Sequence, residues 1–397
     1  ATVADGSAAF YNCAGLAHVE RNRLDVSAAA YGLRFYSVQS FLAVRGGPAA
    51  DSSVTEFVAV PTSIAYVREL SPTLMLGLGY FVPRAGNALL SDRLTARTES
   101  GTRSLWSVDA RVTSASSWLV AALGVRLSER VRFGFGLYGI YENEASSTTL
   151  FGQIGAGEMP STALEYATLG QATRISGAPG AGLQLELGHG VTLGLAARGP
   201  QLQLISSASE SINFVLGNVD PQLLGTQSNR ESSAGDQFGF IALGRYSAGV
   251  AYRAGPAQVS AELDVQPGLQ DEDLLVDRVF TFNARAGFTY ALGERVTFGA
   301  GAFSDRAADS ARSDAKIHFY GATLGIKLED VLGLAANERT STLILSSVFA
   351  LRYAYGSGRA DTFLADTDGE LENIVGTAAH GQHVHELALH IGSGLHF

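Results

Sequence analysis

The residues from His383 to Phe397 alternate between apolar and polar or small side chains. Such a period of two predicts a β-strand with one face suited to hydrocarbon and the other to water. A strand of about ten residues with this pattern is typical of a transmembrane β-barrel, which closes so that no backbone group is left unpaired in lipid. An ordinary half-buried strand of a soluble sandwich is the alternative. The apolar face carries Leu387, Leu389, Ile391, Ser393, Leu395 and Phe397, and the other carries Glu386, Ala388, His390, Gly392, Gly394 and His396.

The same alternation recurs along the chain and is clearest from Val279 to Tyr290. We therefore predict an all-β fold, a transmembrane antiparallel barrel of about 14 strands. The other segments are Leu24 to Phe35, Phe57 to Arg68, Thr73 to Val82, Leu119 to Leu127, Val131 to Tyr141, Gly182 to Leu187, Val191 to Arg198, Phe238 to Arg253, Ala257 to Val265, Arg295 to Phe303, Ile317 to Leu328 and Thr342 to Tyr355.

Short and long connections alternate between these segments. Outer-membrane barrels have short periplasmic turns and long external loops, so the alternation predicts the topology. The short links are 69–72, 128–130, 188–190, 254–256 and 291–294, and the long ones are 36–56, 83–117, 142–181, 199–237, 266–278, 304–316 and 356–382. The link 329–341 is longer than the other short turns, and the pattern offers no reason for it.

Composition narrows the class of protein. Only 17% of the 397 residues are charged and the net charge is −10, which argues against a nucleic-acid partner. No apolar run approaches the roughly 18 residues of a membrane-spanning helix, so a helical membrane protein is excluded. A single cysteine, Cys13, excludes an intramolecular disulfide.

Two stretches point to a family. The segment from Ala8 to Ala17, with Asn12, Ala14, Gly15 and Leu16, resembles the amino-terminal Asn-Pro-Ala-Gly-Leu segment of the FadL family of outer-membrane fatty-acid transporters, with Cys13 in place of proline. The stretches 60–66 and 76–83 look like the family's proline-containing second strand and glycine-rich third strand. Family members usually carry more residues before the first segment, which leaves open whether that part is complete here.

The resemblance implies a barrel, residues 24–397, whose lumen holds an N-terminal plug, residues 1–23. Hydrophobic ligands are captured outside and released sideways into the membrane. Weak points on the second and third strands would serve as the lateral opening, since glycine bends a strand or admits another segment and proline removes a ladder donor. A disordered periplasmic tail is the alternative for the first residues. The expected plug residues are Phe10, Asn12, Ala14, Gly15 and Leu16, and those of the opening are Pro61, Gly77, Gly79 and Pro83.

Two of the external connections carry apolar clusters that suggest a ligand groove. Packing of the loops onto one another is an equal alternative. The candidate ligand-binding residues are Phe151, Ile154 and Leu164 in the third connection and Phe214, Val215 and Leu216 in the fourth, with Leu150, Met159, Tyr166, Ile212, Leu223 and Leu224 beside them.

Charged residues at inward positions form a further candidate site. Arg245 and Arg285 could bind a ligand carboxylate, or they could hold the wall through ion pairs. Strand pairing across the turn at 254–255 sets Arg245 opposite Asp264, which predicts an ion pair between them.

Catalytic and metal chemistry find little support. His380, His383 and His385 lack partners at ligand spacing and are expected to be rim histidines. The segment 366–370 departs from a calcium loop at both key positions. Ser393 and His385 share a face but lie roughly 26 Å apart along the strand, so they cannot form a dyad.

We therefore expect no metal, no cofactor and no enzyme, but an outer-membrane uptake channel for long-chain fatty acids or similar amphiphiles. A general diffusion porin is the main alternative, and an outer-membrane lipid hydrolase is a weaker one. The expected partners are a hydrophobic small molecule, outer-membrane lipid and the barrel-assembly machinery, which would recognise the terminal Phe397. We expect a monomer.

Overall fold

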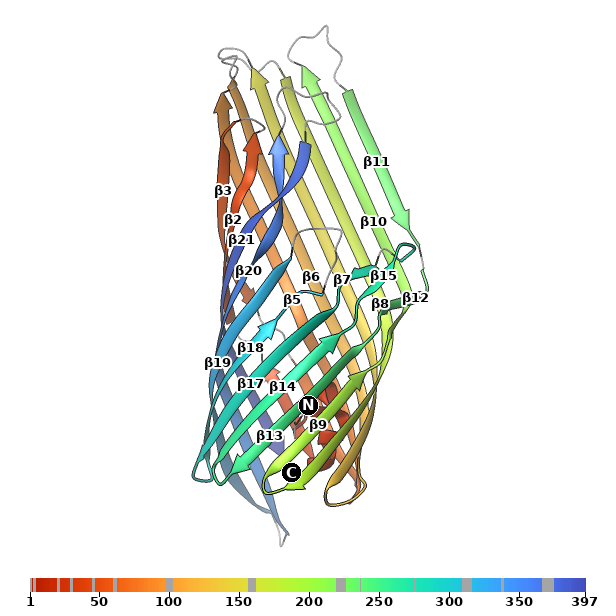
Figure 1. Ribbon diagram of the computed structural model, residues 1–397, viewed down its shortest axis with the longest axis vertical. Helices are drawn as coiled ribbons and strands as arrows, with labels where there is room; N and C mark the ends of the chain where they lie inside the picture. Colours follow the sequence, from red (N-terminus) through yellow and green to blue (C-terminus); the bar gives the residue numbers. More distant parts are fainter. Residues whose placement is uncertain are drawn as a thin grey trace.

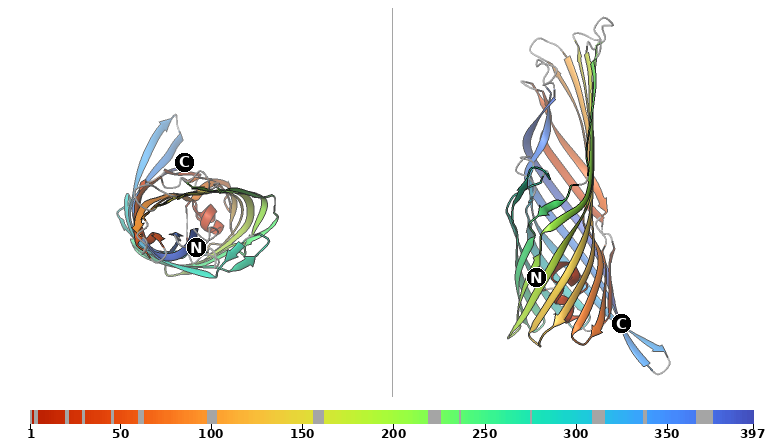
Figure 2. Two further views of the ribbon diagram at one scale, coloured as in Figure 1. Left: turned by 90° about the horizontal axis from the view of Figure 1, so that it is seen from above. Right: turned by 90° about the vertical axis from the view of Figure 1, so that its right-hand side faces the viewer.

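The computed structural model describes residues 2, 5–19, 22–28, 31–44, 47–59, 63–97, 103–155, 162–218, 226–235, 237–274, 276–308, 316–336, 339–365 and 375–397. Its strands form a closed antiparallel barrel with a 14-strand wall (Figures 1 and 2). This confirms the predicted fold class. The last strand closes the barrel by pairing with the first, with Leu395 opposite Leu24 and Leu387 opposite Leu33.

Several wall strands consist of two or three consecutive segments. The first is β1 (Arg23–Ala28) with β2 (Tyr31–Val44), and the second is β3 (Ala49–Ala59) with β4 (Ser63–Ser71). Next come β5 (Leu74–Arg97), β6 (Arg103–Arg126), β7 (Val131–Gly155) and β8 (Thr162–Gly188), then β9 (Val191–Arg198) with β10 (Gln201–Asn218), and β11 (Thr226–Ala234), β12 (Gly239–Ala242) and β13 (Arg245–Ala254). The remainder are β14 (Ala257–Gln266), β17 (Thr281–Leu292), β18 (Val296–Asp305), β19 (Ile317–Ala336), β20 (Arg339–Ala365) and β21 (Val375–His396). A separate small hairpin joins β15 (Leu269–Asp271) to β16 (Val276–Arg278).

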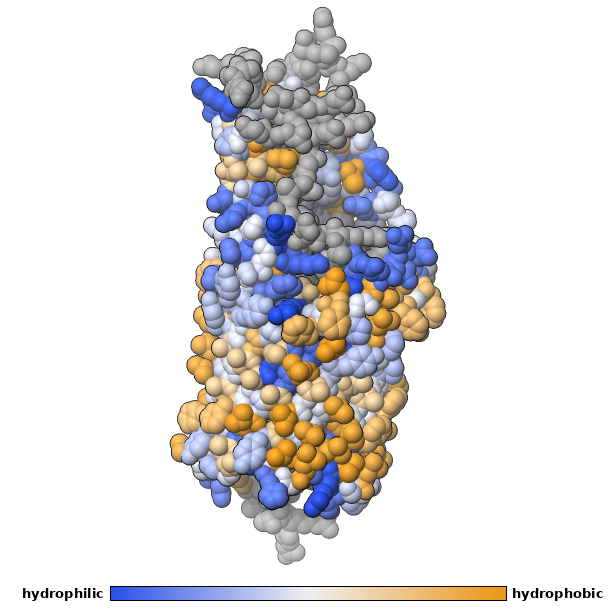
Figure 3. All heavy atoms as spheres, in the orientation of Figure 1, coloured by the Kyte–Doolittle hydropathy of each residue, from blue (hydrophilic) through white to orange (hydrophobic). Residues whose placement is uncertain are grey.

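The alternation along each strand sorts side chains between the two faces of the wall. On β17, the outward side chains Phe282, Phe288 and Tyr290 are 42 to 46% exposed. Leu193, Val250 and Leu263 on other strands of the wall are 36 to 57% exposed. Figure 3 shows apolar side chains gathered over the lower half of the visible face of the barrel. An apolar outer band of this kind is what a barrel needs in lipid. Among the described residues, no helix is long and apolar enough to cross a membrane.

The connections predicted as long loops are for the most part strand. β5, β6, β7 and β8 continue far beyond the predicted ends of their segments and pair along their length, from Phe81 opposite Trp118 up to Arg97 opposite Arg103. Figure 1 shows these strands as a tall extension above the shorter ones. The alternation fades there because both faces of a strand outside lipid accept serine and threonine, whereas the backbone ladder needs no side-chain pattern.

The long link 329–341 is also strand. β19 and β20 pair as a hairpin up to Ala336 opposite Arg339. Figure 2 shows this hairpin leaving the wall at the end of the barrel where the short turns lie. The extra residues in the sequence therefore lengthen two strands rather than a loop.

The first described residues lie inside the barrel. A four-residue helix α1 (Ala8–Tyr11) and a 3₁₀ helix η1 (Cys13–His18) pack against the inner faces of β5 to β8 (Figure 2). We call residues 5–19 the N-terminal segment. Ala8, Ala9, Ala14 and Leu16 are fully buried there, so the main apolar core of the molecule lies between this segment and the wall.

Candidate functional site: the lumen and the N-terminal segment

Asn12 fixes the joint between the two short helices. Its side-chain oxygen accepts a hydrogen bond from the backbone N–H of Ala14 at 3.1 Å, which caps η1. Its amide nitrogen donates to the carbonyl of Leu195 on β9 at 3.2 Å. A residue type suited to helix caps therefore also attaches the N-terminal segment to the barrel wall.

Inward-facing glycines let the segment approach the wall at backbone distance. A Cβ atom at Gly124 would lie 2.7 Å from Cβ of Leu16 and 2.8 Å from the backbone nitrogen of Ala17. A Cβ at Gly134 would overlap the backbone of Cys13 and Ala14. Together these positions form what we call the glycine cradle: Gly77 on β5, Gly124 on β6, Gly134 and Gly136 on β7, and Gly182 on β8.

An aromatic cluster holds the first helix of the segment. The ring of Phe10 lies 4.9 Å from that of Phe81 and 5.4 Å from that of Trp118. The Arg198 guanidinium lies over three rings, 4.7 Å from Phe10, 4.4 Å from Trp118 and 4.8 Å from Tyr138. It also donates to the carbonyl oxygen of Phe10 at 3.1 Å. Cation–π contacts and a charge-assisted hydrogen bond thus join β9 to the segment.

Ion pairs line the lumen beside this cluster. Arg245 pairs with Asp264, which confirms the predicted cross-strand pair. Arg285 pairs with Glu262 at 2.7 Å and reaches Asp264 at 3.5 Å. Both candidate arginines therefore already have carboxylate partners. The space enclosed between these side chains and the N-terminal segment is about 30 Å³, the share of a single water molecule.

A second cluster of charged and polar side chains lies at the C-terminal end of the N-terminal segment. Arg126 donates to the carbonyl of Ala17 at 3.0 Å, and Arg132 pairs with Glu186 at 2.8 Å. Nε2 of His18 lies 3.8 Å from the same carboxylate. Burial, and secondly the positive charge of Arg132, nevertheless lowers the pKa of His18 to about 4, so the imidazole is neutral at pH 7. Burial also raises the pKa of the Cys13 thiol, which stays protonated.

Solved structures of transport barrels share this architecture. A FadL homologue of Pseudomonas aeruginosa superposes with a TM-score of 0.61 over 99% of this chain and 94% of that chain, at 12% sequence identity. The Pseudomonas putida toluene transporter TodX gives 0.57 at 12% identity, over 98% and 93% of the two chains. The monoaromatic hydrocarbon channel CymD gives 0.56 at 10% identity, over 99% and 93%. The chain has the FadL fold. No protein-family model matches the sequence, and neither does any curated protein.

In this FadL-like barrel, the two apolar clusters of the external connections come together as one. Leu150 and Leu164 are buried to 2% exposure or less, and Ile154, Phe214 and Leu216 pack against them. β7, β8 and β10 bring them together because these strands pair side by side. Phe151 and Val215 stand at the alternate positions of the same strands, with Val215 38% exposed. Trp106 of β6 and Phe41 of β2 are buried in the same cluster, and the sequence analysis did not identify them.

The expected opening on the third strand is fully paired in this structure. Gly77 and Gly79 face Val67 and Ala65 of β4 and Ala122 and Val120 of β6 without interruption. The ladder instead shifts register between Phe81 and Arg84, around Pro83. A Cβ at Gly77 would lie 2.8 Å from Leu16, and one at Gly79 would overlap the ring of Phe81. Pro61 lies outside the described residues.

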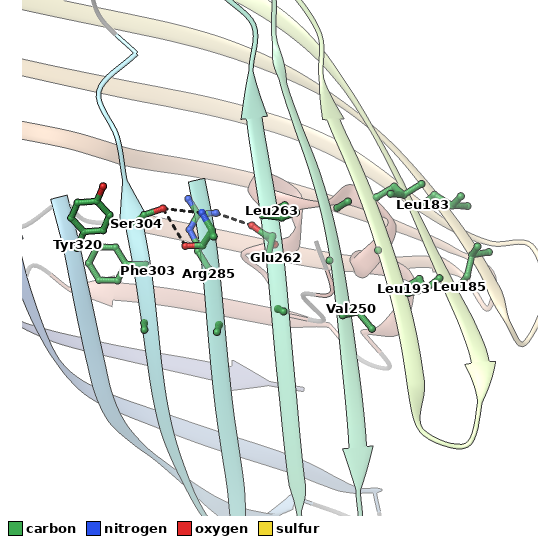
Figure 4. A pocket seen from close by; sticks show the side chains of 18 residues that line it. Leu183, Leu185, Leu193, Val250, Glu262, Leu263, Arg285, Phe303, Ser304 and Tyr320 are labelled. Carbon is green, nitrogen blue, oxygen red and sulfur yellow. Dashed lines mark hydrogen bonds and ion pairs between the residues drawn. The ribbon is translucent and has the colours of Figure 1, made fainter. Parts of the chain in front are cut away.

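The FadL-like wall has a depression of about 800 Å³ over β8 to β19 (Figure 4). The sequence analysis did not predict it. Exposed leucines such as Leu193 and Leu263 line one side and Tyr320 the other, while the Arg285–Glu262 pair lies at its inner edge. The wall between them is built of small residues, which leaves space for hydrocarbon: Gly194, Ala248, Gly249, Ala261, Ala284, Ala286 and Ala302. The sequence feature that could have predicted this depression is the presence of alanine and glycine on both faces of adjacent strands.

Metal chemistry has no site in the described part of the chain, where no three His, Cys, Asp or Glu side chains are placed to hold an ion. The acidic segment 366–370 lies outside the described residues. His383 and His385 instead form hydrogen bonds with tyrosines of β20.

Proposed function

We propose that the chain belongs to the FadL family and is an outer-membrane uptake channel for hydrophobic molecules, with long-chain fatty acids or similar amphiphiles as ligands and the N-terminal segment as its plug. The observation that supports this most directly is the glycine cradle. A segment that only hung below the barrel would place no demand on inward positions of four neighbouring strands. Here Gly124 and Gly134 admit the backbone of the segment itself.

The charge of the lumen favours an acidic ligand. Three guanidiniums, of Arg198, Arg245 and Arg285, line the small space beside the segment, against the two carboxylates of Glu262 and Asp264. At about 30 Å³ this space has no room for a ligand carboxylate as it stands, so the ligand would have to displace Glu262 or Asp264 from its arginine. TodX is a toluene transporter and CymD a monoaromatic hydrocarbon channel, and hydrocarbons carry no such group, so the lumen charge distinguishes the two ligand classes.

The proposal also covers capture, release, insertion and assembly state. The apolar cluster around Leu150, Leu164 and Phe214 is the capture site, and release is lateral near Pro83, where the ladder of β5 is irregular. Lateral release is favoured because each CH₂ group exposed to water costs about 0.8 kcal/mol. Insertion uses the C-terminal Phe397, and the working unit is a monomer.

Ligand binding by the purified barrel tests the proposal. A fluorescent long-chain fatty acid is titrated into the full chain in detergent, and unlabelled oleate and toluene are added as competitors. We expect displacement by oleate at much lower concentration than by toluene. Equal displacement by both would move the ligand class to neutral hydrocarbons, and no saturable binding of either would contradict the proposed uptake function.

A further inference from the structure

A polar surface lies on the outside of the barrel where the apolar run of β21 ends. Leu387, Leu389 and Phe397 are 40 to 49% exposed on the outer face. The next two outward residues along the strand are His385 and His383, both exposed. Nothing in the uptake of a hydrophobic ligand calls for imidazole groups on this face.

The height of these histidines follows from the strand geometry. The outward run from Leu387 to Phe397 covers ten residues, roughly 33 Å along a strand and about 25 Å along the membrane normal at the usual tilt. That is the height of the apolar band of an outer-membrane barrel. His385 and His383 therefore lie at the level of the lipid headgroups at the end of the barrel opposite its short turns, which is the outer leaflet.

Neighbouring strands continue the polar surface sideways in two rows. Both rows run over five adjacent strands of the wall, and neither contains an acidic residue. Aromatic residues predominate in the lower row, and hydroxyl and imidazole groups make up the upper row. The lower row is Thr55, Phe35, His385, Tyr355 and Tyr320, and the upper row is Ser53, Ser37, His383, Ser357 and His318.

Tyrosines of β20 hold both imidazoles in place. The hydroxyl of Tyr353 lies 2.8 Å from Nδ1 of His385, and that of Tyr355 lies 2.8 Å from Nδ1 of His383. Tyr355 also stacks on His383, with an interplanar angle of 16°. A hydroxyl that donates to Nδ1 places the imidazole proton on Nε2. In that tautomer each ring presents an N–H donor on the exposed face; in the other, Nδ1 donates to the tyrosine and the hydroxyl proton is the free donor.

We propose that this surface, consisting of His383, His385, Tyr353, Tyr355, Ser37 and Ser357, binds the phosphate group of an outer-leaflet lipid. A phosphate offers only acceptor oxygens, which match a surface of N–H and O–H donors without carboxylates. The acyl chains of the same lipid lie along the leucines directly below. Tyrosines alone would satisfy the aromatic belt of a membrane protein, whereas the imidazoles and serines add phosphate donors. The inference requires the membrane location in the proposed function but not transport.

Native mass spectrometry of the full chain provides the test. The protein is reconstituted into phosphatidylcholine nanodiscs with a tenth of the lipid as phosphatidic acid, and the lipids retained on release into the gas phase are counted. We expect the wild type to retain phosphatidic acid preferentially. The double variant His383→Leu/His385→Leu should lose about tenfold in that preference, which corresponds to about 1.4 kcal/mol.

Two controls keep the result interpretable. His189→Leu removes a histidine from the turn between β8 and β9 at the opposite end of the barrel and should retain phosphatidic acid like the wild type. Fatty-acid binding should be unchanged in the double variant, which shows that the barrel is folded and separates this site from the transport function. Equal retention in the double variant and the wild type would overturn the proposal. Displacement of the lipid by an equal concentration of inorganic phosphate would also overturn it, because the site would then bind phosphate without the lipid.

Discussion

Adding a single methyl group at Gly124 should loosen the N-terminal segment from the wall. In Gly124→Ala the new Cβ would lie 2.7 Å from Cβ of Leu16, 2.8 Å from the backbone nitrogen of Ala17 and 3.0 Å from the carbonyl oxygen of Cys13. Ordinary contacts of a Cβ begin near 3.4 Å, so the segment must move away by a few tenths of an ångström at three points. Two of these points are backbone atoms, which cannot rotate aside as a side chain can.

Overpacking of this kind typically costs about 1 to 3 kcal/mol. The cost falls on the docked state alone, because in the undocked state the methyl group meets only the open lumen. The ratio of undocked to docked segment should therefore rise roughly 5- to 150-fold. The barrel ladder is unaffected, since alanine is compatible with a strand.

Single-channel recording in a planar bilayer measures this ratio as the frequency of conducting events. We expect Gly124→Ala to open more often than the wild type, and the deletion of residues 1–16 to conduct continuously. Gly139→Ala is the matched control, because a Cβ at that glycine of β7 meets no atom within 4 Å. Wild-type event frequency in a correctly folded Gly124→Ala barrel would refute the reasoning, and equal conductance before and after the deletion would favour an open porin.

Three further predictions concern other parts of the site. The pKa of His18 is lowered to about 4 in the docked segment, below its value of 6.5 in the undocked one, so protonation favours the undocked state. Docking of the segment should be strongest above pH 6.5 and should weaken by up to about 3 kcal/mol as the pH falls to about 4. Below about pH 4 it should change no further. Conductance should rise over this range in the wild type and stay constant in His18→Gln. Arg285→Ala should lower the melting temperature, because Glu262 and Asp264 lose the Arg285 guanidinium; unchanged fatty-acid affinity in the same preparation would remove Arg285 from the ligand site. Gly79→Val, whose new side chain meets the ring of Phe81, should slow fatty-acid uptake by a folded barrel, and wild-type uptake would exclude an exit at this strand.

The period-two pattern was sufficient to predict the barrel, the strand count and the facing of individual side chains. It predicted the Arg245–Asp264 ion pair, which is present, although the observed register sets Ser247 opposite Asp264 and Arg245 reaches the carboxylate diagonally. The pattern failed to predict strands in the part of the barrel that does not contact lipid. Above the lipid, nothing compels alternation, so the upper halves of β5 to β8 resembled loops.

The glycine cradle was missed for a different reason. An inward glycine in a barrel is common, and one sequence does not reveal which glycines face a second segment. Gly77 was singled out as a point of bending or close approach, and the structure shows Leu16 beside it. The alignment of Gly124, Gly134 and Gly182 at paired positions of adjacent strands was the available signal. The convergence of Leu150, Leu164 and Phe214 likewise depends on pairings that are distant along the chain.

The N-terminal segment is attached to the wall in two ways. It continues along the chain into the first strand, and it also contacts strands that come later in the chain. After it the chain enters β1, which pairs with β21 at the seam where the first and last strands of the wall meet. The segment itself packs against β5 to β8 and forms hydrogen bonds with β9. The segment therefore connects the strand at this seam to other strands of the wall from inside the lumen. Separating β1 from β21 would pull on a segment that Phe10 and Leu16 anchor among β5 to β8.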